Sequence, residues 1–258
     1  MANEKVISFD LKADFAFFKK PDFNEGLQLS YNMLHKPALL GILGAIIGLE
    51  GYKQKGAFPQ YYQLLKVLAV GIEPLQHERG NYQKTSVKYT NGVGYANSDG
   101  TLLIEEMMLV KPAYRCYLQL DCTNETEAKL YEYLVDGKCE FIPYLGKNEF
   151  QAWLENIQEW SAEPVIDESV FSINSLFIKE GSLRNQRVEA ELAFAFEDTG
   201  EFGTFSYFER LPISFNEILF QYQLIDFIFT DWKLRPESKV SSLYQLNAGN
   251  QQKIIQFF

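Results

Sequence analysis

Basic and aromatic residues alternate in one part of the chain, residues 76–100, where residues typical of a protein core are rare. Lysine and arginine side chains neutralise phosphates, and tyrosine rings stack on unpaired bases at about 1 to 3 kcal/mol per base. The pattern therefore predicts a surface that binds single-stranded nucleic acid, although an ordinary solvated hairpin would show the same residues. The candidate binding side chains are Arg79, Tyr82, Lys84, Lys88 and Tyr89.

A second polar cluster, formed by Tyr31, His35 and Lys36, precedes an apolar run. Pro37 suits the first position of a helix, so the unpaired N–H groups of the first turn would lie beside His35 and Lys36. A helix N-terminus of this kind can bind an anion such as a phosphate. The alternative is that the cluster is a surface loop in front of an ordinary core helix.

The apolar run, residues 36–49, carries a stripe of small residues. At 100° per residue, Gly41, Gly44 and Gly48 lie on one side of the expected helix. Each glycine inside a helix costs about 1 kcal/mol relative to alanine, which predicts that another backbone or a ligand passes close to the stripe. The run is too short for a membrane span, which needs about 20 apolar residues.

Residues suited to catalysis or metal binding are scarce. The chain has 2 histidines, His35 and His77, and it lacks the spacing of metal ligands, of a phosphate-binding loop and of a hydrolase nucleophile. Its 3 cysteines show no metal-ligand pairing, as expected for reduced thiols in a cytoplasm. We therefore predict no catalytic residue, no metal, no cofactor, no signal peptide and a cytoplasmic location.

The net charge of −10 argues against a protein that coats nucleic acid without specificity. The charge is unevenly distributed, because the first 90 residues hold 11 Lys/Arg and 8 Asp/Glu whereas the remaining residues hold 13 and 26. Any contact with a polyanion should therefore lie in the first third of the chain. The acidic remainder could meet a basic protein partner.

The hydrophobic pattern predicts a strand at residues 7–17, where apolar and polar residues alternate and one face would be buried. Asn-Gly and Asp-Gly pairs between residues 91 and 100 indicate the tip of an extended hairpin. The last hundred residues are strand-like, with alternation at residues 188–196, while residues 219–229 fit helix or strand. Further strands are expected at residues 67–72, 102–110 and 114–121.

Two later helices are expected. Asn124 with Glu127 resembles an N-terminal helix cap before residues 128–135. Apolar residues then recur at helical spacing after Asn148, which predicts a further helix. These residues are Phe150, Trp153, Leu154, Ile157 and Trp160.

The order strand, helix, strand, hairpin, strand, helix fits an α+β fold of the ferredoxin-like, or RRM-like, βαββαβ type. We predict such a domain over residues 1–160, with a protruding thumb hairpin at about residues 76–100. A β-rich C-terminal extension would follow over residues 161–258, with the boundary near residues 160–167. This fold by itself does not fix a function.

Five segments of the chain resemble the CRISPR-associated Cas-five family, a group of RAMP-superfamily subunits of type I Cascade complexes. Residues 7–12 (ISFDLK), 29–31 and 36–49 are similar to the N-terminal signature of the family. Residues 105–117, EEMMLVKPAYRCY, resemble its strand after the thumb, and residues 143–147 resemble its PYLGK turn. The resemblance covers about the first 160 residues, and nothing after them matches a motif of the family.

The resemblance implies a cytoplasmic RNA-binding protein of antiviral defence that binds the 5′ handle of the guide RNA (crRNA). The hairpin would act as a thumb against a Cas-seven-type backbone subunit, and the chain would also contact a Cas-eight-type large subunit. The RNA-binding residues would be those of the two polar clusters. The order of elements is most similar to the type I-B branch.

The sequence leaves two other functions open. A branch of the family in type I-C systems cuts repeat RNA with a Tyr, Lys and His set. Tyr31 could match the tyrosine of that set, but no Lys-His pair occurs near the hairpin. We therefore predict a subunit without catalysis. The first alternative is a metal-independent endoribonuclease in which Tyr31 and His35 assist attack by a ribose 2′-OH. The second is a protein-interaction module whose acidic C-terminal part is the working surface and whose hairpin binds no RNA.

Overall fold

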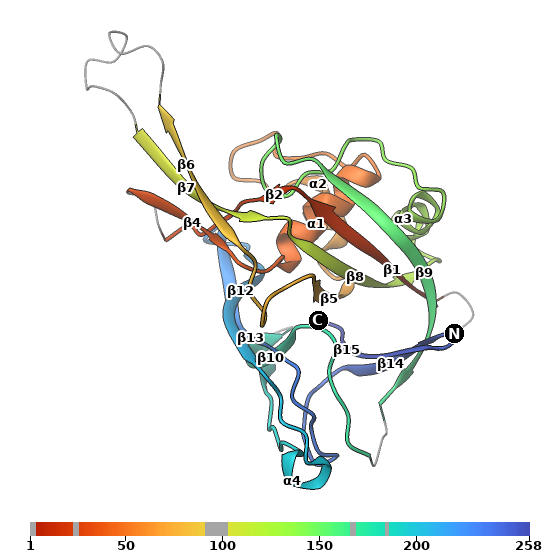
Figure 1. Cartoon of the computed structure of the whole chain (residues 1–258). Helices are drawn as coiled ribbons and strands as arrows, with labels where there is room; N and C mark the ends of the chain where they lie inside the picture. The colour runs from red at the N-terminus through yellow and green to blue at the C-terminus, as the bar shows by residue number, and fades with distance from the viewer. Residues whose placement is uncertain (1–3, 23–25, 91–102, 166–168, 184–185) are drawn as a thin grey trace.

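The computed structural model describes residues 4–22, 26–90, 103–165, 169–183 and 186–258, which form a mixed α+β protein (Figure 1). The described strands belong to three sheets. A six-stranded sheet lies at the centre, a second sheet bears a projecting hairpin, and a four-stranded sheet is built from the last third of the chain. The α+β class predicted from the sequence is confirmed.

The central sheet contains β1 (Glu4–Ala13), β5 (Ala69–Leu75), β8 (Ala113–Asp121), β9 (Ala152–Pro164), β14 (Leu243–Ala248) and β15 (Gln251–Gln256). Its strand order is β15-β14-β9-β1-β8-β5, and every neighbouring pair is antiparallel. Helix α1 (Lys36–Ile46) lies between β1 and β5 in the chain, and α3 (Glu125–Val135) connects β8 to β9.

One face of the central sheet packs against helices. Ile7 and Phe9 of β1 are fully buried and share a cluster with Leu43 of α1 and Leu130 of α3. Because side chains two residues apart on a strand point to the same face, Leu11 and Ala13 of β1 also reach this core. The last apolar positions of the predicted alternation do not, since Phe15 is exposed and Phe17 packs in a separate cluster with Met108 and Phe150. The short helix α2 (Gln60–Leu65) contacts α1.

The opposite face of β1 is also covered, so the prediction of a strand with one buried face is wrong. Val6 packs with Trp160 of β9, Leu246 of β14 and Ile255 of β15. The sheet continues into β14 and β15 and brings these residues onto the second face. Ser8 lies there too, and its Oγ accepts a hydrogen bond of 2.8 Å from Trp160 Nε1.

Asp10 is the buried charge on this second face, only 3% exposed. Its carboxylate accepts hydrogen bonds from Arg115 Nε (2.7 Å) and Nη2 (3.1 Å) and from Asn156 Nδ2 (2.8 Å). A buried carboxylate is tolerated only when it is paired and hydrogen-bonded. The polar positions of the alternation in β1 are thus interior groups with partners rather than solvated ones.

The segment after Asn148 is strand β9 and not the predicted helix. β9 pairs with β1 from Ala13↔Ala152 to Val6↔Trp160, with a register shift between Ser8 and Asp10. At the shift an extra residue in β9 alters which side chains share a face, so helical spacing in the sequence is compatible with a bulged strand. The hydrogen-bond ladder with β1 and the packing of Trp160 stabilise the extended conformation, although the apolar residues recur at helical spacing in the sequence.

The predicted domain boundary near residues 160–167 begins inside β9, which continues to Pro164. Beyond Trp160 the strand pairs with β14, for example through Glu163↔Gln245. The central sheet therefore contains strands from both predicted parts of the chain.

The second sheet combines β2 (Phe15–Ala16), β3 (Phe18–Lys19), β4 (Leu27–Tyr31), β6 (Lys84–Thr90) and β7 (Leu103–Val110). The strand predicted over residues 7–17 is thus interrupted after Ala13. β6 and β7 pair antiparallel from Lys84↔Leu109 to Thr90↔Leu103 and project from the body at the upper left of Figure 1. This confirms an extended hairpin; its predicted tip, residues 91–100, lies outside the described residues.

The predicted cap of α3 is confirmed. Asn124 Oδ1 accepts hydrogen bonds from the backbone N–H groups of Thr126 (2.9 Å) and Glu127 (3.4 Å), so the helix begins at Glu125. Glu127 differs from a standard capping box, because its carboxylate accepts from the N–H of Asp121 (2.8 Å).

The third sheet has the order β11-β10-β13-β12, formed by β10 (Phe177–Leu183), β11 (Gln186–Glu189), β12 (Ser206–Asn216) and β13 (Gln221–Thr230). The alternation at residues 188–196 predicted a longer strand, but β11 ends at Glu189 and Phe196 begins the short helix α4 (Phe196–Thr199). Residues 219–229, left open by the sequence, are largely strand β13. Among the described residues no helix is long and apolar enough to cross a membrane.

The glycine stripe of α1 is approached by side chains rather than by another backbone. A Cβ on Gly44 would lie 2.4 Å from Tyr61 Cβ, and one on Gly41 would lie 3.7 Å from the Tyr61 ring. Gly48 follows the helix with a φ of +77°, and a Cβ there would lie 2.9 Å from Glu140 Cγ. The expected close approach exists at Gly44, and the group that makes it is the side chain of Tyr61 on α2.

Gly44→Leu should therefore destabilise the protein, because the new side chain would force α1 and α2 apart. Overpacking of this kind typically costs about 1 to 3 kcal/mol in the free energy of unfolding. Urea denaturation measures the loss. Gly51→Leu is the matched control, since no heavy atom lies within 4 Å of a Cβ built on Gly51; equal stability of the two variants would contradict this packing.

Candidate functional site

The described part of the hairpin displays three of the predicted nucleic-acid-binding side chains. Lys84 and Lys88 are exposed on β6, and Tyr89 keeps 38% of its surface accessible. Lys88 Nζ lies 3.6 Å from the carboxylate of Glu105 on β7, its cross-strand neighbour. Arg79 is exposed at the root of the hairpin. Because successive side chains of a strand point to opposite faces, Lys84 and Lys88 lie on one face of β6 and Tyr89 lies on the other. An anionic strand that contacts all three must pass along the edge of the hairpin.

Tyr82 does not belong to this surface. The residue is 5% exposed, and its hydroxyl lies 2.5 Å from the carbonyl oxygen of Ala113 and 3.0 Å from that of Leu75. Its backbone N–H donates to Asn32 Oδ1 (3.3 Å). The predicted stacking of a base on Tyr82 does not fit this placement, because the ring is enclosed by the core and ties the hairpin root to β5 and β8.

Tyr31 and His35 meet at the N-terminus of α1, but this end of the helix is buried in the interior. Their ring centroids are 5.3 Å apart, and both residues are less than 5% exposed. His35 Nδ1 accepts a hydrogen bond from the N–H of Ala38 (3.3 Å), so His35 itself caps α1. This hydrogen bond uses the N–H of Ala38, which is one of the backbone donors that the predicted anion site would need.

Burial determines the protonation of both residues. It lowers the pKa of His35 to about 3, because the charged imidazole would be desolvated. It also raises the pKa of the Tyr31 hydroxyl to about 12, with smaller contributions from nearby carboxylates. Neither group titrates near neutrality.

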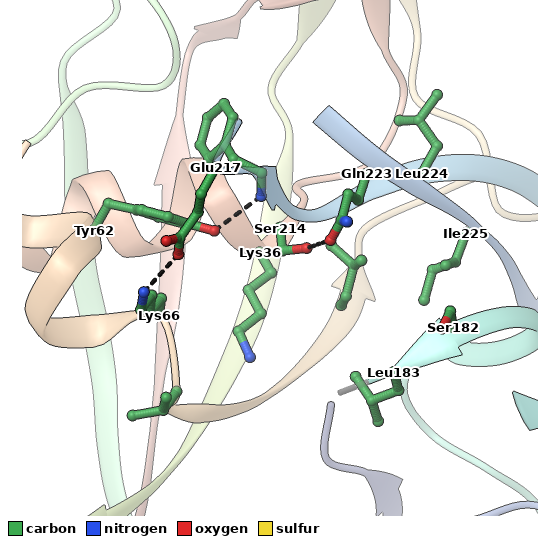
Figure 2. Close-up of a pocket in the computed structure, with 13 residues that line it drawn as sticks. Lys36, Tyr62, Lys66, Ser182, Leu183, Ser214, Glu217, Gln223, Leu224 and Ile225 are labelled. Atoms are coloured by element: carbon green, nitrogen blue, oxygen red, sulfur yellow. Dashed lines mark hydrogen bonds and ion pairs between the residues drawn. The ribbon is translucent and has the colours of Figure 1, made fainter. Parts of the chain in front are cut away.

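Lys36 points away from Tyr31 and His35. Its Nζ donates to the carbonyl oxygen of Phe258 (3.0 Å), and its side chain enters a pocket of about 880 Å³ that α2, β12 and β13 also line (Figure 2). At one end of this pocket Lys66 forms an ion pair with Glu217 (2.5 Å). The structure therefore separates Lys36 from the two residues with which the sequence grouped it.

A second pocket, of about 770 Å³, follows the small-residue side of α1. Four tyrosines line it: Tyr52, Tyr61, Tyr144 and Tyr222. Tyr52 and Tyr144 are 62% and 42% exposed. Sequence analysis missed this aromatic groove because its tyrosines come from four separate segments of the chain.

The turn at residues 143–147 lies between the groove and the hairpin. The carbonyl oxygen of Leu145 accepts from the N–H of Phe17 (3.1 Å), and the N–H of Leu145 donates to the carbonyl of Phe150 (2.9 Å). Gly146 has a φ of +87°, and a Cβ there would lie 2.0 Å from the carbonyl oxygen of Phe17. The turn requires glycine for both reasons.

Lys147, the last residue of this turn, contacts the hairpin. Its Nζ lies 2.7 Å from Glu106 Oε2 on β7, 3.2 Å from Glu149 Oε1, and 4.5 Å from the centroid of the Tyr89 ring. Partial burial lowers the pKa of the Lys147 ammonium, but the hydrogen bonds to Glu106 and Glu149 outweigh it and leave the pKa raised. Lys147 was absent from the predicted site residues, and only its place in the PYLGK segment drew attention to it.

Within the described residues no group of three or more His, Cys, Asp or Glu side chains is arranged to hold a metal ion. His77 has a packing role: its Nδ1 accepts from the N–H of Gly80 (3.0 Å), and its ring contacts Phe205 and Phe229.

No family model and no curated protein matches this chain. The similar solved structures include CRISPR proteins and chains of RNA-guided complexes. A CRISPR protein from Archaeoglobus fulgidus is 13% identical, with 98% of this chain and 99% of that chain covered and a TM-score of 0.48. A chain of a CRISPR RNA-guided surveillance complex is 12% identical (88% and 91% covered, TM-score 0.46). A chain of a Type III-B Cmr-beta complex bound to cognate target RNA and AMPPnP is 11% identical (90% and 86% covered, TM-score 0.44). At these values the likeness by itself assigns no function.

The buried His35 should make the protein less stable in mild acid. Its pKa is about 3 in the folded protein and 6.5 in the unfolded chain, so only the unfolded chain binds the proton between these values. The free energy of unfolding therefore falls as the pH drops below about 6.5, by about 2 kcal/mol at pH 5 from this group.

Urea denaturation of wild type and His35→Asn at about pH 7.5 and about pH 5 measures this dependence. The asparagine keeps a side-chain oxygen for the helix cap, so the comparison concerns the change with pH rather than absolute stability. His77→Asn is the control and should keep the part of the acid-induced decrease in the free energy of unfolding that comes from His35. If His35→Asn showed the same decrease as wild type, other groups would cause the acid sensitivity.

Proposed function

We propose that this chain is a CRISPR-associated RAMP-type subunit of the Cas-five family that binds the 5′ handle of the guide RNA without cutting it. In this proposal it works in the cytoplasm as part of a type I complex, with the type I-B branch as the most similar. A Cas-seven-type backbone subunit and a Cas-eight-type large subunit are its protein partners.

The observation that carries the proposal is the spatial arrangement of the segments that resemble the family. Residues 7–12 lie in β1, and residues 105–117 cover parts of β7 and β8, with β8 as the partner of β1. The glycine-striped helix α1 packs on this pair of strands. The turn at residues 143–147 binds Phe17 and contacts the hairpin through Lys147. Segments far apart in the sequence thus form one contiguous unit.

The topology supports the same proposal. The four adjacent strands β9-β1-β8-β5, with α1 after the first in chain order and α3 before the last, have the order of a ferredoxin-like βαββαβ unit. The β6–β7 hairpin is inserted between β5 and β8 and projects as the thumb of the family would (Figure 1).

The RNA surface that we propose is smaller than the sequence predicted. Lys84, Lys88 and Tyr89 on the hairpin remain, together with Arg79 at its root, because they are accessible. Tyr31, His35, Lys36 and Tyr82 are left out, because each is less than 10% exposed and has an internal partner. The tyrosine-lined groove beside α1 extends the surface beyond the turn at residues 143–147.

The placement of both histidines supports binding without cleavage. Cutting RNA without a metal needs a base for the 2′-OH and an acid for the leaving oxygen, each titrating near neutrality. His35 is buried, its Nδ1 is engaged in the helix cap, and its pKa is about 3. His77 Nδ1 accepts a backbone hydrogen bond, and burial lowers its pKa. Neither histidine is therefore placed to act as the general base of the endoribonuclease alternative.

Replacing Lys84 and Lys88 by Ala should weaken binding of a single-stranded RNA that carries the repeat-derived 5′ handle. Each phosphate contact adds about 0.7 to the salt slope of single-stranded RNA binding, so the slope should fall by about 1.4. Fluorescence anisotropy over a salt titration measures both quantities. Lys138→Ala/Lys239→Ala is the matched control, since both lysines are exposed and lie in ion pairs elsewhere. Unchanged affinity and slope in the hairpin variant would favour a protein-interaction module.

The purified protein should leave repeat RNA intact over hours in the presence of a chelator. Denaturing gel electrophoresis of labelled repeat RNA checks this. A single product whose formation is abolished by Tyr31→Phe or His35→Ala would contradict the proposal and establish the metal-independent endoribonuclease.

A further inference from the structure

Tyr89 is covered on one side by another part of the same chain. Lys147 Nζ lies over its ring at 4.5 Å from the centroid. The residue as a whole is 38% exposed, near the end of the described part of β6. A cation thus lies against the ring of a tyrosine that still has accessible surface.

Lys147 is held in place from several directions. Glu106, itself 8% exposed, accepts a hydrogen bond of 2.7 Å from Nζ, and Glu149 lies 3.2 Å away. The rings of Phe17 and Phe150 each have their centroids 5.8 Å from Nζ. The side chain of Lys147 is only 23% exposed. Such a lysine has little freedom to leave the Tyr89 ring.

The backbone that carries Lys147 is equally fixed. Gly146 adopts a positive φ against the carbonyl of Phe17, and both backbone groups of Leu145 are hydrogen-bonded. The antiparallel register determines which hairpin side chains face Lys147. It places Val87 across from Glu106 and Tyr89 across from Ile104. Tyr89, Val87 and Glu106 therefore share the hairpin face that meets the turn.

A cation within about 6 Å of a ring centroid attracts the ring, and the attraction is stronger where the pair is shielded from solvent. An exposed tyrosine without such a contact would lose rotamer freedom when a base stacks on it, and that loss weakens binding. A ring that is already oriented avoids the loss. Because Lys147 covers one side, a single base can stack on Tyr89, and it must approach from the side opposite Lys147.

We propose that Lys147 is a positioning residue that holds Tyr89 as a one-sided stacking platform for one nucleobase of single-stranded RNA. The inference rests on the proposed function, since it concerns how the hairpin binds RNA. Lys147 acts through Tyr89 and not by contact with a phosphate, because its ammonium is already directed at Glu106, Glu149 and the ring.

A double-mutant cycle in RNA affinity tests this role. The probe is a fluorescein-labelled oligo(A) RNA of about 12 nucleotides, read by fluorescence anisotropy at several salt concentrations. The variants are Tyr89→Leu, which removes the ring, Lys147→Met, which removes the charge at similar length, and the pair together. Lys147→Arg tests rescue, because arginine also stacks on aromatic rings and pairs with carboxylates.

Tyr89→Leu should weaken binding by about 5- to 150-fold, the range for one stacked base. Lys147→Met should weaken it by about 2- to 30-fold when Tyr89 is present and by no further amount when Tyr89 is already Leu. The salt slope should stay unchanged in Lys147→Met, and Lys147→Arg should bind as wild type does. Melting temperatures recorded for every variant identify any general loss of structure.

Lys5→Met is the matched control. Lys5 also lies over a tyrosine ring, 5.6 Å from the centroid of Tyr131, and pairs with Glu159 at 3.3 Å. This variant removes the same kind of contact far from the hairpin and should bind RNA as wild type does.

If the losses of RNA affinity in Tyr89→Leu and Lys147→Met were additive in the double variant, and the salt slope of Lys147→Met fell by about 0.7, Lys147 would bind a phosphate. The inference would then be wrong. Wild-type affinity in both single variants would also overturn it while leaving the proposed function intact. A wild-type protein that binds neither oligo(A) nor the handle RNA would instead refute the proposed function itself.

Discussion

The arrangement of this protein depends on one strand, β1, which is hydrogen-bonded along both edges and buried on both faces. β8 pairs with one edge and β9 with the other. Ile7 and Phe9 fill the helix-facing core, while Asp10 is held on the opposite face by Arg115 and Asn156. Leaving that carboxylate without its donors would be costly in a buried site, so the register of three strands is specified by polar as well as apolar contacts.

The two parts of the candidate RNA surface are positioned by the partners of β1. β8 follows β7 and so carries the hairpin, and β9 follows the turn that contains Lys147. The contact between Lys147 and Tyr89 therefore forms only when both edges of β1 are correctly paired. Loops and hairpins on a rigid scaffold are common places for binding residues for this reason.

Tyr82, which the sequence marked as ligand-binding, instead joins the hairpin root to the body. Asn32 is the centre of this connection. Its side-chain Nδ2 donates to the carbonyl of Gly80 (2.9 Å), and its backbone carbonyl oxygen accepts from the hydroxyl of Tyr114 (3.1 Å). Tyr82 lies in the same network. Polar residues near a projecting element serve both to anchor it and to bind a partner, and burial separates the two roles.

The sequence by itself determined the local elements whose pattern and tertiary setting agree: the strand that contains Ile7, the helix with Pro37 in its first turn, the cap at Asn124 and the hairpin. It failed at β9, where the bulge opposite β1 disguises a strand as a helical pattern. It also could not tell the buried Tyr82 and His35 from the accessible Tyr89, since all three have polar neighbours in the sequence. Tertiary structure alone decided which side chains reach solvent and brought Lys147 onto Tyr89, because these depend on pairing between distant strands, which one-dimensional periodicity does not encode.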